Sequence, residues 1–170
     1  MSPGPAERAW PPVALVLLVG PAGCGKSTWA ARRFRADQVL SSDAFRVMVA
    51  GDAADQSATA DAFRLLHQAA TARLLRGLFT VVDATNLTAA ARRSLLQVAR
   101  RADRPAVAVV FDVPLARCLA QNASRRGRQV PEAVVRRHHR QLQEARASLS
   151  GEGYAEIRVV GTADLDGQVG

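Results

Sequence analysis

The chain has 170 residues, of which 48% are hydrophobic, and this is enough for one globular domain with a buried core. Only 5% are aromatic, which argues against a base-stacking surface for single-stranded nucleic acid. The formal net charge is +8 and no apolar run approaches the roughly 20 residues of a membrane span, so we expect anionic partners and no membrane insertion.

The first segment, residues 1–12, contains four prolines and predicts a flexible leader without the features of a secretory signal. The apolar run 13–19 then predicts a buried strand. It leads into Gly20–Thr28, a full match to G-x-x-x-x-G-K-[ST] that opens a helix ending near Arg35. This order of strand, glycine-rich loop and helix predicts a phosphate-binding loop for a nucleoside triphosphate.

Each residue type in the loop has a physical reason. Glycines let the backbone amides curl around an anion at the positive end of the following helix. Lys26 is the only lysine among 23 basic residues, and its slim ammonium can lie along phosphates where a forked guanidinium is bulkier. Ser27 offers a hydroxyl to Mg²⁺. The residues expected to bind the nucleotide here are Gly23, Cys24, Gly25, Lys26, Ser27 and Thr28.

Strands and helices alternate along the rest of the chain. Strands are predicted at 38–40, 79–83, 106–111 and 156–160; helices at 41–50, 61–76, 88–102, 114–124 and 131–149; and a loop at 51–60. Five short apolar strands separated by helices predict one α/β domain over 13–161, with a parallel sheet and helices on both faces. Residues 162–170 read as a weakly structured tail.

Two aspartates follow predicted strands. Ligands gather beyond the carboxyl ends of parallel strands, so Asp43 and Asp83 are expected near the phosphate loop. Asp43 faces the side where an acceptor hydroxyl would arrive, but it could equally cap the next helix, as Ser41 and Ser42 also could. Asp83 resembles the acidic residue that supports Mg²⁺ through water in phosphate-loop enzymes. The alternatives are that Asp83 contacts the acceptor or caps the next helix.

The break at 125–129 between two helices has the composition of a lid. Arginines on such a segment can close over a transferring phosphate, and the alternative is a solvated turn. His138 and His139 are adjacent on a helix, cannot form a metal pair, and are expected at the surface. His67 is expected to be structural. Cys24 and Cys118 lack metal-type spacing and predict reduced thiols in a cytoplasmic protein.

Several short motifs occur in order after the phosphate loop: Ser42-Asp43-Ala44-Phe45-Arg46, Asp55-Gln56, Phe63-x-x-Leu66-His67, Val81-Val82-Asp83-Ala84-Thr85-Asn86 and Arg125-x-x-Arg128-Gln129-Val130. From about Val13 to Val160 the chain resembles the kinase domain of bacterial polynucleotide kinase-phosphatases, with a fainter similarity to the phage polynucleotide kinase. Members of that family usually carry a phosphatase or another repair domain, so an excised domain and a stand-alone kinase both stay open.

The resemblance implies roles for individual residues. Asp43 would be the general base for a 5′-hydroxyl, and Arg46 would bind phosphate near the acceptor. Arg125 and Arg128 would be lid arginines that reach the nucleotide. Asp83, Thr85 and Asn86 are the further residues expected at the substrate.

The resulting hypothesis is an ATP- and Mg²⁺-dependent kinase acting on the 5′-OH end of DNA or RNA, with other repair domains or proteins as further partners. Residues 92–146 support a polyanionic acceptor, because they contain 13 arginines and four acidic residues. A solvated helix face and the arginine-rich composition explain part of that charge. A kinase of a small metabolite and a non-catalytic nucleotide-dependent nucleic-acid-binding module are the alternatives.

Overall fold

A computed structural model describes residues 9–126 and 129–166. The strands are β1 Leu15–Val19, β2 Val39–Ser41, β3 Thr80–Asp83, β4 Ala106–Phe111 and β5 Glu156–Val160. The α-helices are α1 Lys26–Arg33, α2 Ser42–Ala50, α3 Thr59–Leu75, α4 Ala89–Arg101, α5 Leu115–Ser124, α6 Glu132–Ser148 and α7 Thr162–Asp166. Within the same residues, 3-10 helices lie at Ala36–Gln38, Gln56–Ala58 and Leu149–Gly151.

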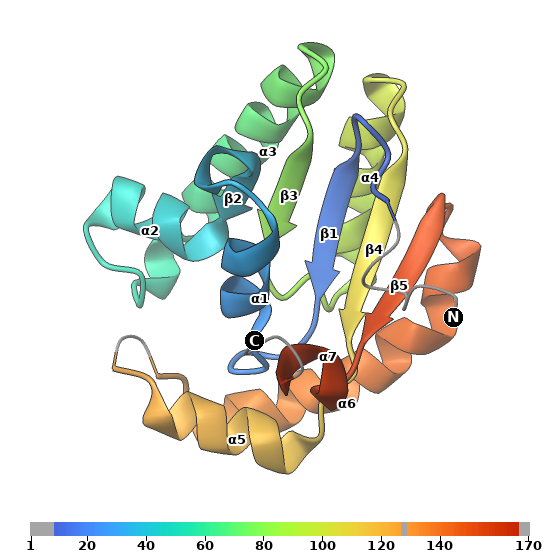
Figure 1. Ribbon diagram of the computed structural model, residues 1–170. Coiled ribbons are helices and arrows are strands. Elements are labelled where there is room, and N and C mark those ends of the chain that lie inside the picture. The colour runs from blue at the N-terminus through green and yellow to red at the C-terminus, as the bar shows by residue number, and fades with distance from the viewer. Residues whose placement is uncertain (1–8, 127–128, 167–170) are drawn as a thin grey trace.

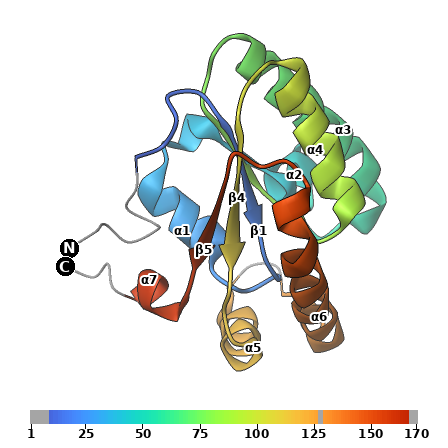
Figure 2. The same ribbon diagram turned by 90° about the vertical axis from the view of Figure 1, so that its right-hand side faces the viewer.

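The described strands form one parallel sheet in the order β2-β3-β1-β4-β5, which confirms the predicted α/β architecture. All carboxyl ends therefore meet at one edge, above α5 and the start of α6 in Figure 1. Helices cover both faces: α1 and α7 lie on one side, and α3, α4 and α6 on the other (Figure 2). The central strands β1, β3 and β4 are buried throughout, as continuous apolar runs predict.

Alternating strand residues divide the core into two layers. Leu15, Leu17 and Val19 of β1 pack with leucines of α3, α4 and α6, whereas Val16 and Leu18 pack with Trp29 and Phe34 on the α1 side. This two-sided burial fixes the register of β1, because a shift by one residue would exchange its two faces. The loop that follows β1 is thereby held at the carboxyl edge.

Two described segments, at Trp10 and at residues 162–166, differ from the sequence prediction. Trp10, which lies in the predicted flexible leader, packs edge-on against Phe34 and Phe79, and the Arg158 guanidinium stacks 3.7 Å above its ring. Residues 162–166 of the predicted weak tail form α7. Both segments gain order from contacts with distant parts of the chain, a stabilisation that local composition does not reveal.

A buried ion pair holds the loop after β3. Arg92 of α4 is 1% exposed and binds both carboxylate oxygens of Glu152, at 2.9 and 2.7 Å. Its Nη1 also donates to the backbone oxygens of Asn86 and Leu87, at 3.1 and 2.7 Å. The guanidinium thus ties Glu152, which follows the last 3-10 helix, to the loop directly after β3.

We expect Glu152→Gln to destabilise the fold strongly, because it leaves the buried Arg92 charge without its counter-ion. Breaking a buried pair costs roughly 3 kcal/mol or more, about 6–12 °C in melting temperature for a domain of this size. The side-chain hydrogen bond from Arg92 lowers the pKa of Glu152, so the pair's contribution is present above the unfolded pKa and is lost as the pH falls through the folded pKa.

Thermal melts at pH 7 and at pH 3–4 measure both effects. Glu144→Gln on exposed α6 surface is the control and should melt like the wild type. Between pH 7 and pH 3–4, the melting temperature of Glu152→Gln should fall less than that of the wild type. An unchanged melting temperature at pH 7 would contradict the structural role of the pair.

Candidate functional site

The loop between β1 and α1 is shaped by glycines. Gly23 and Gly25 have φ of 79° and 94°, a left-handed conformation that side-chain-bearing residues rarely adopt. A Cβ on Gly23 would lie 2.8 Å from the Cys118 backbone oxygen of α5. The loop is therefore curled and leads into α1, as the motif predicts, and the structure also places it against α5.

Lys26 extends along this loop. Its Nζ donates to the backbone oxygens of Gly20 and Pro21, at 2.9 and 2.6 Å, and the residue is 8% exposed. An ammonium has three donors that rotate freely, so these bonds can be exchanged for bonds to phosphate oxygens.

Cys24 is also in the loop, and its buried sulfur accepts from Lys26 Nζ at 3.7 Å. Burial raises the pKa of the Cys24 thiol, and burial raises that of Cys118 to about 12. Both thiols are therefore protonated at neutral pH and act as small apolar side chains.

A hydroxyl and a carboxylate meet beside the loop. Ser27 Oγ donates to Asp83 Oδ2 at 2.7 Å, and Asp83 is 7% exposed at the end of β3. Asp83 does not cap α4, because Thr88 accepts from the Ala91 amide at that position. Oxygen ligands of this kind suit Mg²⁺, so the residues present fit the predicted metal.

Asp43 and Arg46 lie one turn apart on α2, which directly follows β2. Arg46 Nη1 donates to Asp43 Oδ1 at 2.7 Å, and its Nε donates to Thr59 Oγ1 at 3.3 Å. The N-cap of α2 is Ser41, whose hydroxyl accepts from the Ala44 amide, so capping does not explain Asp43. The Asp43 side chain is 39% exposed and that of Arg46 is 9% exposed. The carboxylate is thus accessible, and the arginine that holds it is anchored.

Thr85 and Asn86 lie in the loop after β3. The Thr85 backbone oxygen accepts from the Gly20 amide at 3.0 Å, and Asn86 Nδ2 donates to the Leu18 backbone oxygen at 2.8 Å. Asn86 has a positive φ of 47° and is buried, so its amide nitrogen fixes the loop against β1. Contact of either residue with a substrate stays a prediction.

Two cavities meet at the phosphate loop. The first has a volume of about 540 Å³ and the second of about 670 Å³. Gly23, Ser27 and Arg125 line both, whereas Asp43, Arg46 and Lys26 line only the second. The loop therefore separates two spaces, and a group bound at the loop is reachable from each of them.

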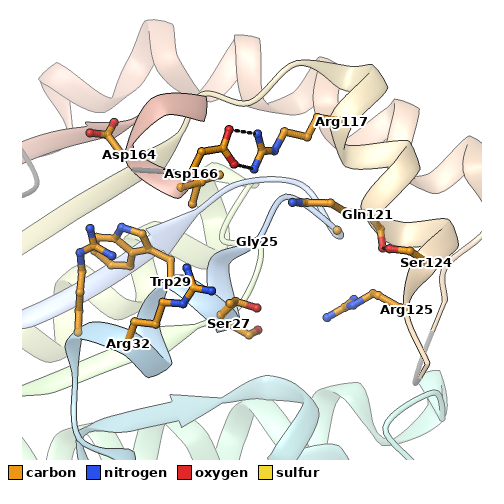
Figure 3. A pocket seen from close by; sticks show the side chains of 14 residues that line it. Gly25, Ser27, Trp29, Arg32, Arg117, Gln121, Ser124, Arg125, Asp164 and Asp166 are labelled. Atoms are coloured by element: carbon orange, nitrogen blue, oxygen red, sulfur yellow. Dashed lines mark hydrogen bonds and ion pairs between the residues drawn. The ribbon is translucent and has the colours of Figure 1, made fainter. Parts of the chain in front are cut away.

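The first cavity lies between α1, α5 and α7. Arg117 of α5 and Asp166 of α7 face each other and form a bidentate ion pair, at 2.7 and 2.5 Å, and Arg125 lies just after the end of α5 (Figure 3). Trp29 and Arg32 of α1 also line it. Sequence reasoning missed Arg117 and Asp166, because the cavity exists only once α7 folds back beside α5.

The second cavity includes two histidines that the sequence assigns to other roles. His138, expected at the surface, is half-buried, and its Nδ1 accepts from the Ala22 amide of the phosphate loop at 3.4 Å. His67 lies 2.7 Å from the Phe63 backbone oxygen and 2.9 Å from Ser94 Oγ, as a structural residue would, but it also lines the cavity. The pairing of His138 with the loop depends on how α6 packs, which its sequence neighbours do not indicate.

Of the two arginines predicted for the lid, Arg125 is exposed just after α5 and lines both cavities. Arg128 lies outside the residues that the structure describes, so its role stays a prediction.

A family model described as an AAA domain matches residues 15–149, most of the chain and all of the phosphate loop. The chain belongs to this AAA domain family. No protein of curated function matches its sequence significantly. This match and the parallel sheet agree with the predicted α/β P-loop fold class.

Solved structures with a similar fold include several kinds of protein. A chain of the Pnkp1/Rnl/Hen1 RNA repair complex is 24% identical with a TM-score of 0.67, over 84% of this chain and 48% of that one. A gluconokinase from Sinorhizobium meliloti 1021 is 20% identical with a TM-score of 0.58, over 89% and 83%. AvrRxo1-ORF1:-ORF2 with ATP is 17% identical with a TM-score of 0.69, over 89% and 55%.

These likenesses establish the fold. They confirm the resemblance to polynucleotide kinases as a likeness of fold. The chain spans about half the length of the RNA-repair chain it matches. Among the described residues, no helix is long and apolar enough to cross a membrane.

Proposed function

We propose that the protein is an ATP-dependent kinase that transfers the γ-phosphate to the 5′-hydroxyl end of DNA or RNA. The observation that carries this proposal is the placement of the phosphate loop between two cavities, with the accessible Asp43 carboxylate in the second. A phosphoryl donor and an acceptor can then approach one loop from opposite sides.

On the donor side, the loop amides and Lys26 bind the β- and γ-phosphates, and the nucleoside lies in the cavity between α1, α5 and α7. Ser27 and Asp83 would hold Mg²⁺, Asp83 directly or through water. When bound, Mg²⁺ would neutralise charge on the phosphates. A divalent-ion requirement follows, and EDTA should abolish transfer.

On the acceptor side, Asp43 takes the proton of the attacking hydroxyl. The hydroxyl oxygen forms a bond to the γ-phosphorus as the bond from that phosphorus to the β–γ bridging oxygen breaks, and ADP leaves. Arg46 holds the carboxylate in place through the 2.7 Å ion pair, and the buried position of Arg46 limits its movement. Positioning and charge neutralisation supply most of the catalysis in such reactions.

A polynucleotide acceptor is favoured by the basic segment 92–146 and by the motifs around Asp43 and Asp83. A small-metabolite kinase is the second candidate, favoured by the fold shared with a gluconokinase. A non-catalytic module is disfavoured, because Lys26, Asp43 and Ser27 lie together around the loop.

One assay separates these candidates. The protein is incubated with γ-labelled ATP, Mg²⁺ and matched DNA and RNA oligonucleotides that carry a 5′-OH or a 5′-phosphate, and with a sugar acid such as gluconate. We expect label only on 5′-OH oligonucleotides. Label on gluconate alone would support the metabolite kinase, and ATP binding without transfer to any acceptor would support the module.

Arg125 supplies a further test. Because it lines both cavities, Arg125→Ala should lower turnover with every 5′-OH acceptor, and more than it lowers ATP affinity. Arg125→Lys should rescue poorly, since a point charge cannot reproduce a forked bidentate contact. We expect a loss of about 10²-fold or more, as for other groups that stabilise transition-state charge.

Arg126→Ala is the matched control, because the adjacent Arg126 is exposed and lines neither cavity. Steady-state kinetics with acceptor varied at two salt concentrations distinguish the two roles. Normal turnover at saturating acceptor, with weaker binding and a shallower salt dependence, would show that Arg125 only tracks the nucleic-acid backbone.

A further inference from the structure

In the proposed reaction the first cavity is the nucleotide cavity, and the second, which Asp43 lines, is the acceptor cavity. The acceptor cavity carries more positive than negative charge. Among the described residues that line it, the cations are Lys26, Arg46, Arg125 and Arg137, and the carboxylates are Asp43 and Asp83. An acceptor that enters this space without a negative charge would leave cations without counter-ions. The cavity is therefore suited to an anionic acceptor.

Most of these cations already have a place in the proposed reaction. Lys26 belongs to the phosphate loop, Arg46 holds the Asp43 carboxylate at 2.7 Å, and Arg125 borders the nucleotide cavity as well. Arg137 of α6 is different, because it lines the acceptor cavity and does not line the nucleotide cavity. Its charge is thus available to the acceptor.

The contacts of α6 support this distinction. Arg136 binds Glu132 at 2.6 Å and Arg146 binds Asp112 at 2.7 Å, both within ion-pair distance. Within the described part of the chain, Arg137 forms no ion pair or hydrogen bond. An exposed guanidinium beside a cavity, with its forked donors unused, is well suited to a phosphate.

Arg137 and Asp43 line the same cavity from different helices. α6 brings Arg137, His138 and Gln141 to the cavity, and His138 touches the phosphate loop at Ala22. Asp43 comes from α2, a separate wall of the same space. A strand whose 5′-hydroxyl is at Asp43 can therefore present its first phosphate to a different wall.

We propose that Arg137 determines acceptor specificity by binding the phosphate that joins the 5′-terminal nucleotide to the rest of the strand. This inference rests on the proposed function and adds a residue that selects phosphate-bearing acceptors. Arg137 binds and positions the acceptor and takes no part in the proton transfer.

The test compares three acceptors that differ in phosphate content: a nucleoside, the same nucleoside with a 3′-phosphate, and a 5′-OH oligonucleotide. Values of kcat/KM are measured for the wild type, Arg137→Gln and Arg140→Gln. Arg140 is on the same helix and lines neither cavity, so its variant removes the same charge without the contact.

For Arg137→Gln we expect kcat/KM to fall about 10- to 100-fold with both phosphate-bearing acceptors, the loss of one charge-assisted hydrogen-bonded contact. The nucleoside value and the KM for ATP should stay unchanged, and Arg140→Gln should behave like the wild type. An equal loss with all three acceptors, an equal loss in Arg140→Gln, or a raised KM for ATP would overturn the proposal.

Failure of the proposed function would look different. If the wild type transfers phosphate to none of these acceptors, the polynucleotide kinase proposal falls. Equilibrium binding of the 3′-phosphorylated nucleoside then decides the role of Arg137. Weaker binding in Arg137→Gln than in Arg140→Gln would keep the phosphate site, and equal binding would remove it.

Discussion

Lys26→Ala should abolish phosphate transfer while the protein stays folded. The ammonium lies along the loop, where it bonds the Gly20 and Pro21 backbone oxygens, and no other lysine exists in the chain to replace it. We expect turnover to fall by roughly 10³-fold or more, since Lys26 neutralises charge on the moving group. Initial rates at saturating ATP and acceptor measure this loss.

Lys26→Arg is the informative companion variant. It keeps the positive charge but replaces a compact ammonium by a planar, forked group in a residue that is 8% exposed. We expect it to stay at least about 10²-fold below the wild type. Circular dichroism and melting temperature control for folding. Near-normal turnover in folded Lys26→Ala would show that this loop is not the catalytic nucleotide site.

Asp43→Asn should lower turnover by roughly 10²-fold or more, the range expected when a general base is removed. Asparagine keeps the size of the side chain, and its Oδ1 can still accept from Arg46 Nη1, which lies 2.7 Å from the present carboxylate oxygen. Ser41 continues to cap α2. We therefore expect little change in stability and a loss confined to the chemical step.

Asp61→Asn is a close match as a control. Asp61 also pairs with an arginine three residues later, at 2.9 Å from Arg64, but it lines neither cavity. Its activity should equal that of the wild type. If Asp43→Asn instead melts much earlier and keeps its turnover, Asp43 has a structural role and the proposed proton transfer is wrong.

Local sequence signals were sufficient for the architecture. The bounds of β4 and β5 agree with the apolar runs 106–111 and 156–160, and Pro114 and Pro131 directly precede α5 and α6. Apolar periodicity, prolines and caps act within a few residues, so they can be read without knowledge of the fold. The phosphate loop can be recognised in the same way, because its glycines and lysine are close together in the sequence and their spacing is characteristic.

The two aspartates show where local signals stop. Their places after β2 and β3 predict that they approach the loop, but spacing alone leaves Asp43 and Asp83 open to capping roles. Ser41 and Thr88 take the caps in the structure, and Asp83 meets Ser27 across 56 positions of sequence. Whether an aspartate caps a helix or faces a ligand depends on which side chain lies within hydrogen-bonding distance of the free amides of that helix. That distance is set by the folded backbone.

The phosphate loop and the parallel α/β domain can be predicted from the amino-acid sequence, because those features depend on neighbouring residues. The other side chains that surround the loop are identified by the folded structure alone. Arg117 meets Asp166 across 49 positions and His138 reaches Ala22 across 116, contacts set by the packing of α5, α6 and α7 at the carboxyl edge of the sheet. Such long-range pairs leave no periodic signal in the chain, since each contact joins residues of two different elements.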